Sequence, residues 1–124
     1  MKDFNGRTAF ITGGAQGIGL GIARALAREG VRIAIADVNK DALAAAEAEL
    51  GATTDVMAVV LDVRDREAFA TVADQVEDGF GPVSLLFNNA GVAGFVMPEM
   101  MTYESSDWVL GVNFGGVMNG IQTF

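Results

Sequence analysis

The sequence of 124 residues contains no cysteine and no histidine. Without cysteine there is no disulfide, thiol nucleophile or cysteine-bound metal. Without histidine, neither a histidine metal site nor a Ser-His-Asp triad can form, so we expect no metal site. No apolar run approaches the ~18 residues of a membrane-spanning helix. The first residues do not have the pattern of a signal peptide, which favours a cytoplasmic protein with no membrane partner.

Basic residues are absent from the second half of the sequence. All eight lysines and arginines lie at or before Arg66, and the formal net charge is −8. Residues 67–124 therefore carry acidic charges only. Such a surface repels the phosphates of nucleic acids and of anionic lipids, so we expect no nucleic-acid partner.

Glycine is abundant, with 16 residues against two prolines, and 51% of the chain is apolar. Continuous apolar runs alternate with stretches of helical periodicity. We predict strands at 8–12, 32–36, 56–61 and 84–87, and helices at 18–28, 40–50, 66–80 and from about 102 onward. Asn39 can cap the second of these helices, and Asp65 opens the third. Continuous apolar strands indicate a sheet covered on both faces. The pattern predicts an α/β fold: a doubly wound parallel sheet, or Rossmann fold, of about four strands plus the following helix.

A glycine-rich loop lies between the first strand and the first helix. Gly13, Gly17 and Gly19 allow a sharp turn and the close approach of a diphosphate to the helix N-terminus. The order strand, loop, helix is the context that such a motif requires. Gln16 and Ile18 of this loop belong to the predicted cofactor-binding group, and Ile18 also begins the apolar face of the helix.

Two other phosphate-binding classes fit less well. Gly14 and Gly19 have the spacing of a P-loop, but Leu20 occupies the position of its lysine. Without that cation the β- and γ-phosphates lack a partner, so hydrolysis of ATP or GTP is not expected. A phospho-receiver domain needs an acidic pair after the first strand and a late lysine, and no lysine follows Lys40.

Asp37 ends the second predicted strand. A carboxylate at this position can accept both ribose hydroxyls of an adenosine and would repel a 2′-phosphate. The glycine loop contains no base, and the nearest one after Asp37 is Lys40. NAD is therefore the favoured cofactor and NADP the less favoured one. Val38 is included in the cofactor-binding group, and the alternative role for Asp37 is to cap the following turn.

The ordered set of motifs resembles the short-chain dehydrogenase/reductase family over the whole chain. The matching residues are Thr12-Gly13-x-x-x-Gly17-x-Gly19, Asp37, Asp62-Val63, Asn88-Asn89-Ala90-Gly91 and Asn113. The resemblance implies an oxidoreductase that transfers a hydride between a nicotinamide cofactor and a small alcohol or carbonyl substrate. It also implies that the full-length protein is a homo-oligomer, a dimer or a tetramer.

The same resemblance implies roles for the residues after the third and fourth strands. Asp62 would bind the adenine amino group, and the backbone of Val63 would hold a ring nitrogen. Asn89, Ala90 and Gly91 would flank the cofactor ribose and brace the central sheet.

Asn113 is the one catalytic residue that the resemblance implies in this chain, as the anchor of a water molecule in a proton relay. It lies among apolar residues of the last predicted helix, where a buried amide needs partners. The alternative is a structural amide bonded to neighbouring backbone. That helix also contains four glycines, each costing ~1 kcal/mol relative to alanine, so it needs a packing partner.

The family's catalytic Tyr and Lys have no counterpart here. Tyr103 has Asp107, not lysine, at its fourth following position, and we expect it to pack at the junction of loop and helix. We therefore expect residues 1–124 to be an incomplete NAD-binding Rossmann domain that ends within a helix and is inactive alone, with the catalytic pair beyond Phe124. The alternative is a non-catalytic dinucleotide-binding module, either a sensor or a partner subunit.

The loop from 92 to 101 is rich in large apolar residues: Phe95, Val96, Met97, Met100 and Met101. They could line a hydrophobic substrate pocket or belong to the core, because methionine-rich patches suit both.

Overall fold

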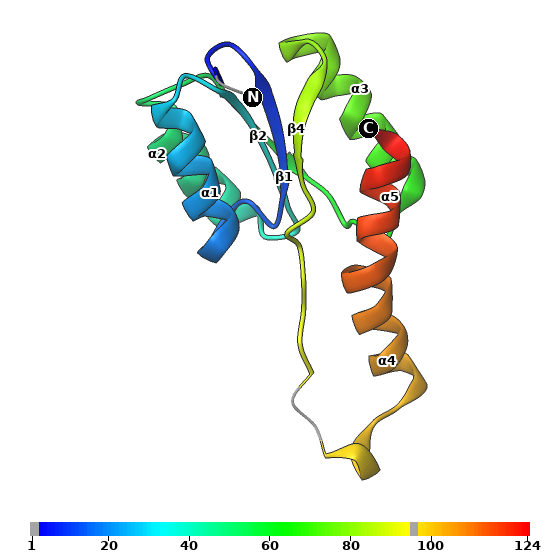
Figure 1. Cartoon of the computed structure of the whole chain (residues 1–124). Helices are drawn as coiled ribbons and strands as arrows, with labels where there is room; N and C mark the ends of the chain where they lie inside the picture. Colours follow the sequence, from blue (N-terminus) through cyan, green and yellow to red (C-terminus); the bar gives the residue numbers. More distant parts are fainter. Residues whose placement is uncertain (1–2, 95–96) are drawn as a thin grey trace.

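A computed structural model describes residues 3–94 and 97–124 of the chain. Within these residues a parallel sheet forms in the order β3-β2-β1-β4 (Figure 1). Its strands are β1 (Thr8–Thr12), β2 (Arg32–Asp37), β3 (Val56–Val60) and β4 (Val83–Phe87). The parallel Rossmann sheet predicted from the sequence is thereby confirmed.

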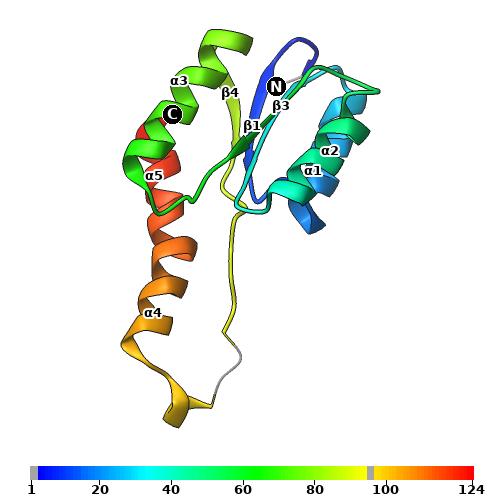
Figure 2. The same ribbon diagram turned by 180° about the vertical axis from the view of Figure 1, so that it is seen from behind.

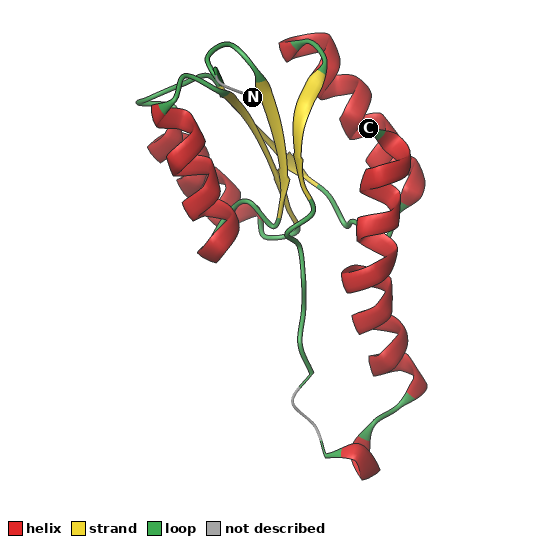
Figure 3. Cartoon of the chain, viewed as in Figure 1, coloured by secondary structure: helices red, strands yellow, loops and turns green. Residues whose placement is uncertain are grey.

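Helices cover both faces of the sheet, as a doubly wound fold requires (Figures 1 and 2). One face carries α1 (Gly17–Arg28) and α2 (Lys40–Leu50), and the other carries α3 (Arg66–Phe80) and α5 (Gly116–Thr123). The strands form the middle layer in Figure 3. The chain after β4 leaves the sheet and returns through α4 (Tyr103–Leu110) and a π-helical segment, Gly111–Gly115, that leads into α5.

The two predicted helix caps that precede α2 and α3 are present. The side chain of Asn39 accepts a hydrogen bond from the Ala42 N–H at 3.0 Å, and that of Asp65 accepts one from the Ala68 N–H at 3.0 Å. Each cap satisfies one of the N–H groups that a helix start leaves without a partner. The two caps therefore fix where the chain turns back from the sheet edge into a helix.

The inner strands are the buried ones. Every residue of β1 is buried, whereas β3 and β4 are partly exposed because they are the two edge strands of the described sheet. Val60 on β3 is 52% exposed. The expectation that both faces of every strand are covered therefore holds for the inner strands and fails at the edges.

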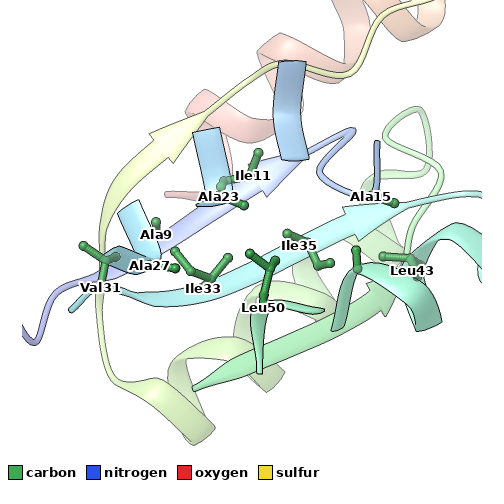
Figure 4. Close-up of a cluster of buried hydrophobic side chains, with 11 residues drawn as sticks. Ala9, Ile11, Ala15, Ala23, Ala27, Val31, Ile33, Ile35, Leu43 and Leu50 are labelled. Carbon is green, nitrogen blue, oxygen red and sulfur yellow. The ribbon is translucent and has the colours of Figure 1, made fainter. Parts of the chain in front are cut away.

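Alternation along β1 divides the core into two halves. Ala9 and Ile11 face α1 and α2 in the cluster of Figure 4. Phe10 points to the other face, where its ring centroid lies 5.9 Å from that of Phe69 and 4.9 Å from that of Phe124. These aromatic contacts join the end of the chain, just after α5, to α3 and to the central strand.

The packed face of α1 agrees only in part with the predicted one, since Ile22 and Leu26 pack against the core as partly buried residues. Its buried residues are Gly19, Ala23 and Ala27, whereas Ile18 is 78% exposed. Small side chains let the helix lie close to the sheet. Ile18 falls in the first turn, at the carboxyl edge of the strands, where the described chain leaves it uncovered.

The predicted packing of Tyr103 after β4 is also wrong. Tyr103 is 92% exposed and does not pack at the loop–helix junction. Met97, Met100 and Met101 are exposed as well, which excludes a core role for them within the described residues, while Phe95 and Val96 lie outside those residues. In the ranges 3–94 and 97–124, no helix combines the length and apolarity needed to cross a membrane.

Candidate functional site

The sheet order places a switch point beside β1. From β1 the chain proceeds to β2 and β3 on one side, and β4 then pairs on the other side of β1. Loops leaving the carboxyl ends of β1 and β4 therefore diverge and open a crevice, which is where open α/β sheets bind ligands.

A cleft of about 540 Å³ lies at this edge of the sheet. Residues following all four strands line it. The predicted cofactor-binding residues among them are Gly13, Gln16, Asp37, Val38, Asp62, Val63, Asn89, Ala90 and Gly91. Gly17, Ile18 and Gly19 do not line the cleft and instead form the first turn of α1.

The glycine loop has the conformation that its glycines were predicted to allow. Gly13 and Gly17 have φ angles of +64° and +59°, in the left-handed region that favours glycine. A Cβ at Gly19 would clash with the carbonyl oxygen of Gly13 and would lie 2.6 Å from Nδ2 of Asn89. The Gln16 side chain, which lines the cleft, makes no cap at the start of α1, the positive end of the helix dipole.

Thr12 and Asn89 join the loop to the end of β4. The buried Thr12 hydroxyl donates to the Phe87 carbonyl at 3.3 Å and accepts from the N–H groups of Asn89 and Ala90, both at 3.1 Å. In return, Nδ2 of Asn89 donates to the carbonyls of Thr12 and Gly13 at 3.1 and 3.2 Å. The sequence indicated Thr12 as part of the glycine motif but predicted no role for it. In the structure, its hydrogen bonds tie the glycine loop to the end of β4.

Asp37 contacts the glycine loop and its own turn at once. Its Oδ2 accepts from the Ala15 N–H at 3.4 Å, and its Oδ1 accepts from the Asn39 N–H at 3.1 Å. The alternative role as a turn cap is therefore present. A carboxylate has about four acceptor sites, so Asp37 retains capacity for ribose hydroxyls.

Asp62 is held by Arg64, a residue that was not among the predicted ones. The Arg64 Nη2 lies 2.6 Å from Oδ2 of Asp62, and Nε lies 3.0 Å from Oδ1. The backbone N–H of Arg64 also donates to Oδ1 at 3.0 Å. These bonds, the guanidinium first, lower the pKa of Asp62 against an opposing effect of its partial burial. The carboxylate therefore stays ionised over the physiological range.

Asn113 is exposed, and not buried as predicted. Its Oδ1 accepts from the Val92 N–H at 2.8 Å, and its Nδ2 donates to the Val92 carbonyl at 2.9 Å. The reason for its exposure is that the π-helical segment extends past the sheet, as the 66% exposure of Phe114 also indicates. The backbone bonds proposed as the alternative role are present.

Val92, the first residue of the loop 92–101, also lines the cleft. Other lining residues were not predicted: Ala36, Leu61, Arg64, Trp108 and Val112. Trp108 and Val112 are one helical turn apart, so one face of the last helix meets the cleft. The spacing of Trp108 and Val112 in the sequence indicates that they share one helix face. Only the fold shows that this face meets the cleft.

A parallel, doubly wound sheet with a glycine loop at its switch point defines the class of Rossmann nucleotide-binding folds. The family model described as short chain dehydrogenase matches residues 7–124, so the chain belongs to the short-chain dehydrogenase/reductase family of oxidoreductases. Within the family, it is 48% identical to the C alpha-dehydrogenase of Sphingobium sp. strain SYK-6, over 100% of this chain and 41% of that relative.

Solved structures agree with this assignment. A short-chain dehydrogenase/reductase from Burkholderia phymatum in complex with NAD matches with a TM-score of 0.96 and 37% identity, over 100% of this chain and 44% of that one. A blue fluorescent protein from a metagenomic library, in complex with NADPH, matches with a TM-score of 0.91 and 31% identity, over 98% and 51% of the two chains. The chain spans less than half the length of the curated relatives that it matches, between 41% and 48% of the first ones.

Proposed function

We propose that residues 1–124 are the NAD-binding Rossmann domain of an NAD-dependent dehydrogenase that transfers a hydride between the cofactor and a small alcohol or carbonyl substrate. The observation that carries the proposal is the Asp37 carboxylate, held 3.4 Å from the Ala15 N–H of the glycine loop. The proposal is supported because a carboxylate beside a loop suited to a diphosphate could accept hydrogen bonds from ribose hydroxyls.

The residues present fit such a cofactor. A Cβ on Gly17 would enter open space with no atom within 4 Å, so the backbone of the loop is accessible to a ligand. The diphosphate would be held at the start of α1 by Gly13, Gln16, Gly17, Ile18 and Gly19. The bound nicotinamide would accept or donate the hydride, which is the chemistry that the cofactor supplies.

The remaining site residues would hold the two ends of the cofactor. Asp37 and Val38 would bind the adenosine ribose, and Asp62 and Val63 would bind the adenine. Asn89, Ala90 and Gly91 would flank the other ribose, and Asn113 would anchor a water molecule that moves a proton. The Val92 backbone already occupies both polar ends of the Asn113 amide, so we assign the relay water to the remaining lone pair of its Oδ1.

NAD is the proposed cofactor, in preference to NADP. The carboxylate of Asp37 would repel a 2′-phosphate, and the cation that the fold brings into the cleft, Arg64, is engaged by Asp62. Family members with known structures bind either NAD or NADPH, so the choice rests on this charge argument.

Titration of the complete gene product with NADH and NADPH tests the proposal. Replacing Asp37 by Ala should weaken NADH binding by roughly 10- to 100-fold, the range for a lost hydrogen bond to a charged group. The ratio of the affinity for NADH to the affinity for NADPH should also decrease. Asp41→Ala, at an exposed site in the first turn of α2, is the control and should change neither value. Unaltered NADH affinity in Asp37→Ala would rule out the ribose role.

A non-catalytic dinucleotide-binding module is the second candidate. The observation behind it is that Tyr103, the single tyrosine of residues 1–124, has Asp107 and not lysine at its fourth following position, so these residues supply cofactor contacts without an acid–base pair. NAD binding without hydride transfer to any alcohol by the complete product would support this candidate and contradict the dehydrogenase.

We also propose a homo-oligomer, dimer or tetramer, in the cytoplasm. The support for an oligomer is the exposure of Leu110, Phe114 and Ile121 on the last helices, at 62%, 66% and 59%. Exposed apolar surface of this kind is suited to packing against protein, and under this proposal a second subunit covers it. Sedimentation analysis of the complete product tests it, and a monomer would contradict it.

A further inference from the structure

Arg64 contacts both oxygens of the Asp62 carboxylate and does so from two directions. The guanidinium approaches Oδ1 and Oδ2, with distances from 2.6 to 3.2 Å. The Arg64 backbone N–H adds a bond to Oδ1. A carboxylate held by side chain and main chain together cannot rotate freely about its side-chain bonds. Its orientation in the cleft is therefore set before any ligand arrives.

The side-chain stem of Arg64 lies against the last helix. A Cβ built on Gly111 would be 3.0 Å from Cδ and 3.4 Å from Cγ of Arg64. Gly111 thus leaves the space through which the arginine stem passes on its way to Asp62. Since Gly111 begins the π-helical segment, the position of the guanidinium depends on that helix as well as on the turn after β3.

Stability does not explain this ion pair. The side chains of Arg64 and Asp62 are 45% and 39% exposed, and exposed pairs contribute little to folding. Both residues line the cleft together with Asp37, and Arg64 is the one base among the lining residues of the described chain. Without it, two uncompensated carboxylates would face an incoming anionic cofactor.

We propose that Arg64 is a positioning residue that orients the Asp62 carboxylate toward the amino group of the cofactor's adenine and so sets the selectivity for that base. The inference rests on the proposed function, since it requires a dinucleotide in the cleft. A carboxylate accepts from the adenine amino group and repels the carbonyl oxygen that hypoxanthine carries at the same place. An oriented carboxylate discriminates between the two bases better than a mobile one.

The test compares NAD with nicotinamide hypoxanthine dinucleotide on the complete gene product. The wild type should prefer NAD. Arg64→Ala and Arg64→Gln should reduce the preference for NAD by about tenfold, the scale of one charge-assisted hydrogen bond. Arg64→Lys keeps the positive charge and should therefore show a smaller reduction. Gly111→Ala, which crowds the stem and keeps the charge, should reduce the preference as well. The control is Arg66→Ala, an exposed base at the start of α3 that does not line the cleft.

Melting temperatures of all variants show whether folding is intact. Wild-type preference in Arg64→Ala would overturn the inference, as would an equal loss of affinity for both dinucleotides. A wild type that binds NAD without distinguishing the analogue would overturn it too. A wild type that binds neither dinucleotide would overturn the proposed function itself, so the two failures are distinct.

Discussion

Gly19 is the residue of the glycine loop with the least space for a side chain. A Cβ there would clash with the Gly13 carbonyl and lie 2.6 Å from the Asn89 amide that braces the loop. Gly19→Ala should therefore weaken NAD binding by more than about tenfold and destabilise the fold by ~1–3 kcal/mol, the usual range for overpacking. Calorimetric titration and chemical denaturation of the complete product measure the two effects.

Gly21 provides the matched control on the same helix. A Cβ at Gly21 meets nothing within 4 Å, and its φ is ordinary for a helix. Gly21→Ala should stabilise α1 by up to ~1 kcal/mol, because alanine is the better helix former, and should leave NAD affinity unchanged. Normal affinity in Gly19→Ala would mean that the loop does not form the binding site.

Asp62 gives the site a defined dependence on pH. Hydrogen bonds from Arg64 lower the pKa of Asp62 below the ordinary aspartate value. The charged pair therefore contributes fully to folding stability above the ordinary pKa of aspartate. This contribution is lost only as the pH falls through the lowered pKa of Asp62. The charged groups that line the cleft with Asp62 are Asp37 and Arg64.

In Arg64→Ala, the acid limb of the pH profile of NAD affinity should move to higher pH. The reason is that Asp62 then protonates near its ordinary pKa. Affinity measured between about pH 3.5 and pH 7 tests this. An identical acid limb in wild type and variant would show that Asp62 does not carry the pH dependence.

Residue identities in the site were more predictable than residue environments. Spacing alone indicated the glycines and the aspartates at strand ends, because turns and strand ends demand particular residues. Burial of Ile18 and of Asn113 was predicted wrongly, since it depends on how far each helix extends past the sheet. Arg64 was missed because its partner is set by a turn that no periodicity reveals.

At the level of elements, the glycines of the last helix fall into two kinds. A Cβ at Gly116 would lie 2.5 Å from Cγ2 and 2.9 Å from Cβ of Val63, in the loop after β3. A Cβ at Gly115 would meet only the Leu110 carbonyl oxygen, at 3.8 Å. Gly116 therefore allows the helix to pack closely against Val63, whereas Gly115 makes no such contact.

Gly116→Ala should lower the free energy of unfolding by ~1–3 kcal/mol, because Val63 cannot move far within its buried site. Gly115→Ala should raise it by up to ~1 kcal/mol through helix propensity. Urea denaturation of both variants of the complete product gives the comparison. Equal effects at the two positions would contradict close packing of α5 against Val63, in the loop after β3.

Strands and caps were predictable as elements, and the π-helical segment was not. Continuous apolar runs indicated the four strands, and Asn39 and Asp65 marked helix starts by their capping chemistry. The segment Gly111–Gly115 gave no sequence signal for its wider turn. In the structure it carries Asn113 toward the Val92 backbone, and π-bulges of this kind are frequent at functional sites.

At the scale of the whole molecule, charge and apolar surface are arranged to suit different partners. The cleft contains Asp37, Asp62 and Arg64 beside the positive end of α1, and the helices after β4 expose Leu110, Phe114 and Ile121. Under the proposed function, the positive end of α1 would receive the diphosphate, the two carboxylates would bind the adenosine, and the exposed apolar helix surface would pack against protein. The parallel sheet follows from the βα alternation, which is why the fold class was predicted correctly, whereas the strand order β3-β2-β1-β4 comes from the structure.

The most direct test is calorimetric titration of the complete gene product with NAD, ATP and FMN in parallel. Binding of NAD at one site per chain, abolished or strongly weakened by Asp37→Ala and Gly19→Ala, is the expected result. ATP should bind more weakly because Leu20 replaces the lysine that its phosphates need. Tighter binding of ATP or FMN than of NAD would contradict the assignment of this cleft to a nicotinamide dinucleotide.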